Sequence, residues 1–201
     1  MINFKRKIKG NNSGLTLVEM LVSMAIFGIL SVSLVTLFTS AMNSQAAILQ
    51  NQELAAQTGY VMEYMHRALR MADIDTTGGC TGTPNSNYGG DSEKISINFL
   101  GYDYTAAIPG YKCMQFSISG NIIQFKQSTD QTDDNFGAAI NMTSSKVKVN
   151  ELSLNVVGDT VNVSQPRVTI MIDAQSTSKR VSPVPTIKLQ TTASQRNLNI
   201  Q

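Results

Sequence analysis

The sequence contains few of the residues on which active sites usually depend. It has no tryptophan, one histidine and two cysteines among its 201 residues. Two cysteines are too few for a zinc site unless histidine contributes, and His66 is the only histidine. No Ser-His-Asp arrangement is evident, and no Walker or dinucleotide-binding glycine motif occurs. We therefore expect neither an enzyme nor a bound cofactor.

Charged residues are also scarce. Asp, Glu, Lys and Arg make up 15% of the chain, whereas they form about a quarter of an average soluble domain. The formal net charge is only +2, and the basic excess lies in a short leader that contains Lys5, Arg6, Lys7 and Lys9. A nucleic-acid-binding domain would carry its basic residues clustered on a folded face. The sequence therefore gives no indication of nucleic-acid binding.

A long apolar run follows this leader, from Gly14 to about Phe38. Such a run is a candidate membrane-spanning segment. Glu19 is the only charged side chain between Lys9 and Glu53. An ionisable residue inside a membrane segment is costly, so it is expected to have a function. The basic flank predicts that the leader stays in the cytoplasm and that the rest of the chain lies outside.

The leader and the apolar run differ from a secretory signal peptide. A secretory signal has a small-residue cleavage site after its apolar run, and none is evident here. The candidate site lies before the run, in the segment Ser13-Gly14-Leu15-Thr16-Leu17-Val18-Glu19. This segment resembles the class III signal of type IV prepilins, in which a glycine precedes a hydrophobic residue and a glutamate stands at the fifth mature position. The one departure is Leu15, where phenylalanine is usual.

The resemblance to the type IV pilin-like superfamily implies a route of processing and assembly. Prepilin peptidase would cleave after Gly14 and remove residues 1–14, and the new amine of Leu15 would be N-methylated. The protein would be a single-pass inner-membrane protein with its head outside the cytoplasm. It would then join other major and minor pilin-like subunits at an inner-membrane pilus assembly platform.

Two roles are open for Glu19. In a filament, its carboxylate is expected to pair with the Leu15 amine of a neighbouring subunit. A wrong axial register would leave a buried charge unpaired, which is strongly unfavourable. Alternatively, Glu19 is an interfacial residue near a helix N-terminus, where the helix dipole favours a negative charge.

The helical pattern continues beyond the membrane segment. Apolar residues recur at three-, four- or seven-residue steps, and no proline occurs before Pro84. We predict one helix from about Thr16 to Asp73, within a helical segment of residues 15–74 whose transmembrane part is about 15–38. The C-terminal half of this helix is expected to pack on a globular head through Met62, Met65 and Leu69.

Residues 75–201 are predicted to form this head. Residues 76–91 are expected to be a loop and 130–143 to be irregular, while Gly120-Asn121 predicts a tight hairpin turn. Alternating apolar residues predict strands at Lys94–Leu100, Tyr111–Ser119, Ile122–Gln127, Lys146–Val157, Val161–Asp173 and Thr186–Thr192. Pro166 is expected to mark an edge or a bulge. The expected fold class is α+β: a pilin-like long N-terminal α-helix packed against an antiparallel β-sheet head.

Cys80 and Cys113 are expected to form a disulfide if the head is exported; the alternative is two buried free thiols. The bond would close a loop of about 33 residues and contribute roughly 3 to 4 kcal/mol in the chain-entropy model. It would tie the loop after the helix to the strand at Tyr111–Ser119. A small exported head would benefit from such a constraint.

The head also carries weaker patterns. Lys148–Leu154 and Gln165–Ile172 look like segments of the W-type minor pilins, and the J-type minor pseudopilins of type II secretion have similar tails. The resemblance implies a structural subunit that initiates, caps or modifies a filament used for adhesion, motility, DNA uptake or secretion. The alternatives are a minor pseudopilin and a signal-anchored extracytoplasmic binding domain. The last predicts no cleavage at Gly14 and no dependence on Glu19.

One acidic segment of the head resembles a metal site only superficially. Asp130, Asp133, Asp134 and Asn135 offer oxygen ligands to calcium but lack the spacing of an EF-hand, so a solvated loop is expected. Tyr102 and Tyr104 are available for contact with a partner, although scattered aromatic residues do not require such a role.

Overall fold

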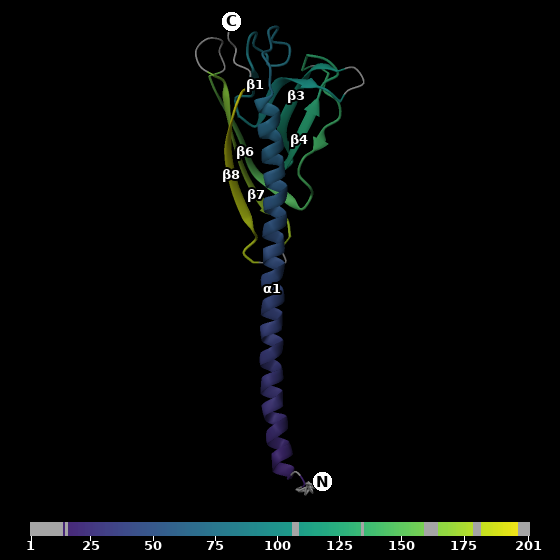
Figure 1. The fold of residues 1–201 in the computed structure, drawn as a ribbon, viewed down its shortest axis with the longest axis vertical. Coiled ribbons are helices and arrows are strands. Elements are labelled where there is room, and N and C mark those ends of the chain that lie inside the picture. The colour runs from purple at the N-terminus through teal and green to yellow at the C-terminus, as the bar shows by residue number, and fades with distance from the viewer. Residues whose placement is uncertain are drawn as a thin grey trace, which may run out of the picture. The chain divides into compact units, whose positions relative to one another are not determined.

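The chain forms one long helix and two antiparallel sheets (Figure 1). The computed structural model describes residues 14, 16–105, 109–133, 135–158, 165–178 and 182–196. By its internal contacts, the chain divides into two units, Met1–Gln45 and Ala46–Gln201. The elements are α1 (Leu17–Arg70), β1 (Tyr88–Gly90), β2 (Ser96–Asp103), β3 (Gly110–Ser119), β4 (Ile122–Gln127), β5 (Ile140–Asn141), β6 (Val147–Val157), β7 (Arg167–Ser176) and β8 (Thr186–Ser194).

Helix α1 is a single α-helix of 54 residues. It ends at Arg70, three residues before the predicted end at Asp73. The reason is that Asp73 already pairs with the sheet: its N–H donates to the carbonyl oxygen of Leu100 at 2.8 Å. Arg67 and Arg70 lie in the last turn, where positive charge interacts favourably with the helix dipole.

The first sheet has five strands in the order β1-β2-β3-β4-β5, and every neighbouring pair is antiparallel. The predicted hairpin joins β3 to β4. Gly120 and Asn121 form its turn with φ angles of 56° and 71°, as a type I′ turn requires at both central positions. The predicted strand at Ile122–Gln127 matches β4 at both ends.

The second sheet has three strands in the order β6-β7-β8, also antiparallel. The two sheets meet where the side chain of Asn121 donates to the carbonyl oxygen of Val149 at 3.0 Å, and Val149 N–H donates back to the Asn121 carbonyl at 2.9 Å. Nearby, Leu154 N–H donates to the carbonyl oxygen of Lys94 at 2.8 Å. The antiparallel β head is therefore confirmed, but its division into two sheets was not predicted.

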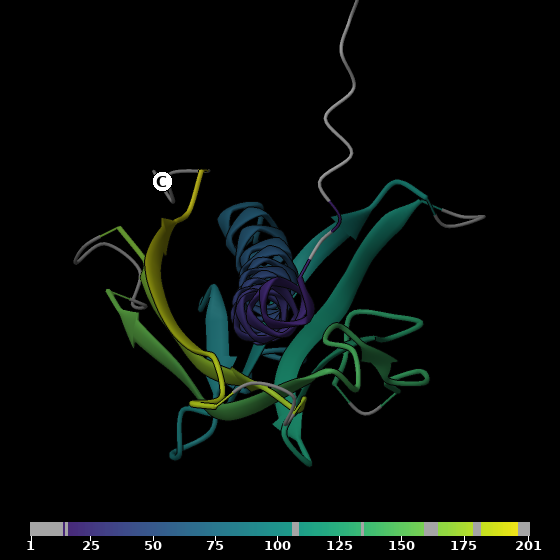
Figure 2. The same ribbon diagram turned by 90° about the horizontal axis from the view of Figure 1, so that it is seen from below.

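The part of α1 from Ala46 onward lies between the two sheets (Figure 2). One hydrophobic core contains side chains from this part of the helix and from both sheets. The helix contributes Leu54, Val61, Met62, Met65 and Leu69, which are 0–8% exposed. The predicted packing of Met62, Met65 and Leu69 on the head is therefore confirmed.

Three predictions for the head need correction. The predicted loop at 76–91 contains β1, and the predicted irregular segment at 130–143 contains β5, because both short strands are defined by their pairing with β2 and β4. The strand predicted at Val161–Asp173 begins at Arg167, after Pro166, and residues 161–164 lie outside the described residues. Proline has no N–H to donate to a neighbouring strand, so Pro166 stands at the start of β7.

Candidate functional site

The N-terminus of α1 is closed by a reciprocal pair of hydrogen bonds. Thr16 Oγ1 accepts from the N–H of Glu19 at 3.3 Å, and Glu19 Oε2 accepts from the N–H of Thr16 at 3.5 Å. The Thr16 carbonyl accepts the first intrahelical bond, from Met20 N–H at 3.2 Å. This arrangement is a capping box, in which an N-cap threonine and a glutamate three residues later satisfy two N–H groups of the helix end.

The apolar run occupies the first turns of the helix after this cap. Its large apolar side chains from Leu17 to Phe38 are 52–77% exposed on all sides of the helix. A helix that is hydrophobic all round requires a membrane or a large protein interior around it. By length and composition, α1 is apolar enough to cross a membrane.

Four hydroxyl groups in or near this run bond to the helix itself. Ser23 Oγ donates to the carbonyl oxygen of Glu19 at 2.7 Å, and Ser33 Oγ donates to that of Ile29 at 3.0 Å. Thr36 and Thr39 make the same kind of bond to carbonyls three residues earlier. Because lipid offers no hydrogen-bonding partners, polar groups in a membrane segment must be satisfied internally. These serines and threonines meet that condition.

Comparison with known proteins places the same segment in a recognised class. Residues 9–35 match the family model of the prokaryotic N-terminal methylation motif. The chain therefore carries a type IV prepilin-like signal, followed by a helix that serves as a candidate single-pass membrane anchor. This signal indicates a structural subunit rather than an enzyme. No curated protein and no solved structure matches the chain.

The structure places only part of the expected site. Gly14 is exposed and lies outside the helix, and Glu19 lies in its first turn. Leu15 and the leader charges Lys5, Arg6, Lys7 and Lys9 lie outside the described residues. The capping role of Glu19 was missed, although the pattern Thr16-x-x-Glu19 before an apolar run is its usual sequence signature.

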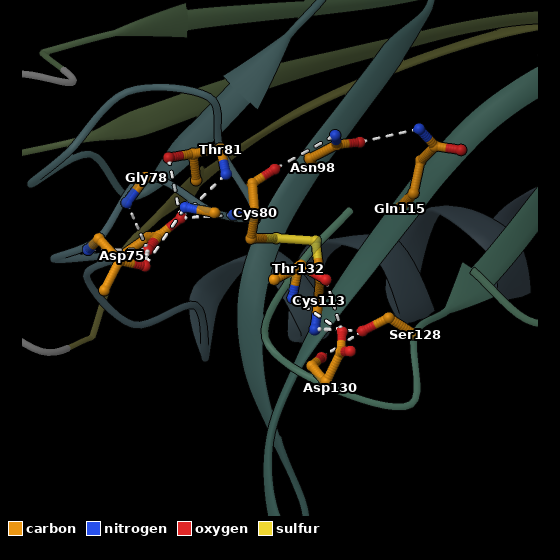
Figure 3. Close-up of a disulfide and its surroundings, with 12 residues drawn as sticks. Asp75, Gly78, Cys80, Thr81, Asn98, Cys113, Gln115, Ser128, Asp130 and Thr132 are labelled. Atoms are coloured by element: carbon orange, nitrogen blue, oxygen red, sulfur yellow. Dashed lines mark hydrogen bonds between the residues drawn. A yellow bond between two sulfur atoms is a disulfide. The ribbon is translucent and has the colours of Figure 1, made fainter. Parts of the chain in front are cut away.

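The predicted disulfide is present in the head. Cys80 and Cys113 are joined, with their Cα atoms 5.3 Å apart, and both side chains are fully buried (Figure 3). It links the segment after α1 to β3. Hydrogen bonds fix both ends: Cys80 O accepts from the side chain of Asn98 at 3.3 Å, and Cys113 N–H donates to Ser128 Oγ at 2.9 Å.

Asp75 organises the loop on the Cys80 side of this bond (Figure 3). Its Oδ1 accepts from the N–H and hydroxyl of Thr77 and from Gly78 N–H, and its Oδ2 accepts from Cys80 N–H and from the N–H and hydroxyl of Thr81. Burial raises the pKa of Asp75, but these hydrogen bonds outweigh burial and lower the pKa below its usual value. The role of Asp75 was not predicted from the sequence, although Asp followed by Thr and Gly is typical of such turns.

Asp130, one of the acidic residues that resemble calcium ligands, accepts hydrogen bonds within its own turn. Asp130 accepts from the side chain of Asn135 at 3.0 Å and from the N–H and hydroxyl of Thr132 at 3.0 and 2.8 Å. These bonds, first of all that from Asn135, lower the pKa of Asp130. Asp134 lies outside the described residues. Among the residues that the structure describes, no group of three or more His, Cys, Asp or Glu side chains is placed to hold a metal ion.

Proposed function

We propose that this chain is the precursor of a minor type IV pilin. The observation that carries the proposal is the methylation motif at residues 9–35, followed directly by an exposed apolar helix. The head supports it, because a disulfide-bonded antiparallel head packed on the same helix suits an extracytoplasmic subunit. In this proposal the protein initiates, caps or modifies a filament and catalyses no reaction.

The proposed route has three stages. The leader with Lys5, Arg6, Lys7 and Lys9 stays in the cytoplasm while the head crosses the inner membrane. Prepilin peptidase cleaves after Gly14, and the amine of Leu15 is methylated. The assembly platform then extracts the subunit from the lipid, and the apolar part of α1 packs against other pilin-like subunits.

Glu19 has two successive roles in this route. In the isolated chain its carboxylate closes the capping box with Thr16. In the filament the same carboxylate pairs with the Leu15 amine of a neighbouring subunit, a stronger partner than a neutral N–H because it is charged. The capping box keeps the carboxylate at the helix end, where the neighbour's amine reaches it.

Mass spectrometry of the mature N-terminus tests the processing. After co-expression with an active prepilin peptidase, the protein should begin at Leu15 and carry one added methyl group. With a catalytically inactive peptidase, the protein should retain residues 1–14. An intact leader with the active peptidase would refute the proposal and favour a signal-anchored extracytoplasmic domain.

A pair of substitutions at Glu19 tests the assembly role. Glutamine also accepts a capping-box bond but has no charge, so Glu19→Gln keeps the cap and removes the proposed ion pair. Both Glu19→Gln and Glu19→Ala should be cleaved normally, and both should be depleted from purified filaments at least tenfold. Normal incorporation of Glu19→Gln would show that charge pairing is not needed.

The proteins that co-purify with assembled filaments identify the machine. Affinity purification of the cross-linked protein should recover other pilus subunits and the pilus assembly platform. Recovery of type II secretion components instead would identify the chain as a minor pseudopilin, and the assignment to a pilus would be wrong.

A further inference from the structure

Strand β8 forms one edge of the three-stranded sheet, and no described strand pairs with its outer side. It is the last strand in the order β6-β7-β8, and it pairs with β7 without a register shift from Thr186 to Ser194. Natural edge strands are usually protected by bulges, prolines or several charges. β8 has no proline within it and one charged residue, Lys188, which is ion-paired with Asp173 at 2.9 Å.

Two hydrogen bonds at the ends of β8 show which of its backbone groups face this open edge. Ser176 N–H donates to the carbonyl of Pro185 at 3.0 Å, and Gln195 N–H donates to that of Pro166 at 3.3 Å. In an antiparallel pair the hydrogen-bonded positions recur every second residue, so the odd-numbered residues of β8 bond to β7. The N–H and C=O groups that point away from β7 belong to Thr186, Lys188, Gln190, Thr192 and Ser194.

The series of outward groups reaches the end of helix α1. The next even-numbered residue, Arg196, donates its N–H to the carbonyl oxygen of Arg70 at 2.9 Å. Among the described residues, none hydrogen-bonds to the outward backbone groups of the five preceding even-numbered positions. The open edge therefore runs along β8 and stops at the helix terminus.

A basic groove lies at that end of the edge. It has a volume of about 540 Å³ and is lined by His66, Arg70, Gln165, Thr192, Gln195 and Arg196, together with Ser194. Among the residues that the structure describes, no Asp or Glu side chain lines it. Within the described part of the chain, neither Arg70 nor Arg196 forms an ion pair, whereas Arg67 on the same helix is paired with Glu63. The groove is therefore complementary to a carboxylate.

We propose that β8 binds an extended segment of a partner protein, which adds to the sheet as a fourth strand and places an acidic side chain between Arg70 and Arg196. Strand addition uses main-chain hydrogen bonds for affinity and side-chain pockets for specificity. The groove beside Thr192 and Ser194 provides such a pocket, and its charge determines the register of the added strand. This inference goes beyond the proposed function, because it concerns the head and does not depend on cleavage at Gly14.

A peptide selection on the full chain in detergent micelles tests this site. The probe is a display library of random nine-residue segments with neutral flanks, and enriched peptides are resynthesised with blocked termini. They should share an Asp or Glu near one end. On binding, hydrogen exchange should slow at the amides of Thr186, Lys188, Gln190, Thr192 and Ser194, and should change little at the odd-numbered amides, which already bond to β7.

Substitutions at the edge and in the groove provide matched controls. Gln190→Pro removes an outward N–H without removing a bond to β7, and should weaken peptide binding at least tenfold, whereas Gln190→Ala should bind as the parent does. Replacing both Arg70 and Arg196 by glutamine should weaken binding and remove the preference for an acidic residue.

Four outcomes would overturn the proposal. One is that no peptide is enriched; another is that bound peptides protect a different set of amides. A third is that Gln190→Pro binds as tightly as Gln190→Ala. The fourth is that the even-numbered amides of β8 are already protected in the free protein, which would mean that the chain covers its own edge. If the double arginine variant keeps its preference for acidic peptides, the carboxylate assignment is wrong.

Discussion

The two parts of helix α1 have the same backbone conformation, but they differ in whether their apolar side chains are exposed or buried. Before Gln45, large apolar side chains such as Leu30 are exposed on every face. After Ala46, apolar side chains such as Val61 and Met65 form a stripe that is fully buried in the head. The first part has almost no charge, whereas Glu53, Glu63 and Arg67 lie on the exposed side of the second.

The two parts of α1 are stabilised in different ways. A stripe buries its apolar area within its own chain, so the second part is stabilised by folding of the head. A helix that is apolar all round gains nothing from its own chain and needs lipid or neighbouring subunits. The polar contacts follow the same division, because the hydroxyl groups of the first part bond to their own helix and Glu53 forms an ion pair with Lys146 of the head at 2.7 Å.

The strongest test replaces one apolar residue in each part. Met65→Ala should reduce the free energy of unfolding of the head by roughly 2 to 5 kcal/mol, because it leaves a cavity at a fully buried position. Leu30→Ala, at a side chain that is 56% exposed, should leave it unchanged. Denaturant unfolding of the full chain in micelles, followed by the near-ultraviolet circular dichroism of tyrosine, measures both. An equal loss of stability in the two variants would refute the claim that only the second part of α1 is stabilised by the head.

Loss of the disulfide should affect only the second part. Replacing both Cys80 and Cys113 by serine should destabilise the head by roughly 3 to 4 kcal/mol, because the unfolded chain loses a constraint across 33 residues. Helicity of the apolar part in micelles should stay the same. Reduction of the parent protein should reproduce the effect, and an unchanged unfolding midpoint under reducing conditions would contradict it.

Acid should destabilise the head through Asp75. A carboxyl group whose pKa is lowered by folding stabilises the folded state above its unfolded pKa, near 3.8, and this contribution is lost as the pH falls through the lower, folded value. Asp75→Asn should reduce the free energy of unfolding by roughly 1 to 3 kcal/mol at neutral pH. The amide NH₂ of asparagine would replace one carboxylate oxygen and would face N–H donors.

The pH dependence supplies the control for that substitution. The stability of the Asp75→Asn variant should depend less on pH below about 4 than that of the parent, since the titrating group is gone. Asp91→Asn is the matched variant, because Asp91 is exposed and accepts from Ile95 N–H and the Ser96 hydroxyl at 3.0 and 3.1 Å. If the two variants show the same loss of stability, burial of Asp75 has no special role.

Local patterns in the sequence were sufficient to predict α1 and most of the strands. The three-, four- and seven-residue spacing predicted the buried face of the helix, and Gly120-Asn121 predicted the turn between β3 and β4, because each signal acts within a few residues. The strands β1 and β5 were missed because they are defined by partners elsewhere in the chain. The division into two sheets was missed for the same reason. The sheets meet through contacts of Asn121 and Lys94 with β6, which lies far from both in the sequence.

The functional sites also divide into one that local sequence patterns predict and one that they do not. The motif around Gly14 and Glu19 is a pattern of adjacent residues, so the sequence alone was enough to find it. The open edge of β8 was not predictable, because it depends on which strand lies at the end of the sheet. Its basic groove combines residues from α1, the segment before β7 and the end of β8, which only the fold brings together.

The smallest expected effect lies at the cap of the apolar part. Thr16→Ala removes the hydroxyl that accepts from Glu19 N–H, and loss of an N-cap threonine costs roughly 1 kcal/mol. Because Thr16 and the residues of the first turn are exposed, the loss should stay local. Hydrogen exchange at the amides of the first helical turn, measured in micelles, should rise about fivefold. Thr16→Ser keeps a hydroxyl at this position and should behave as the parent. The stability of the head should be the same in all three proteins, and a change there would mean that the two parts of α1 are energetically coupled.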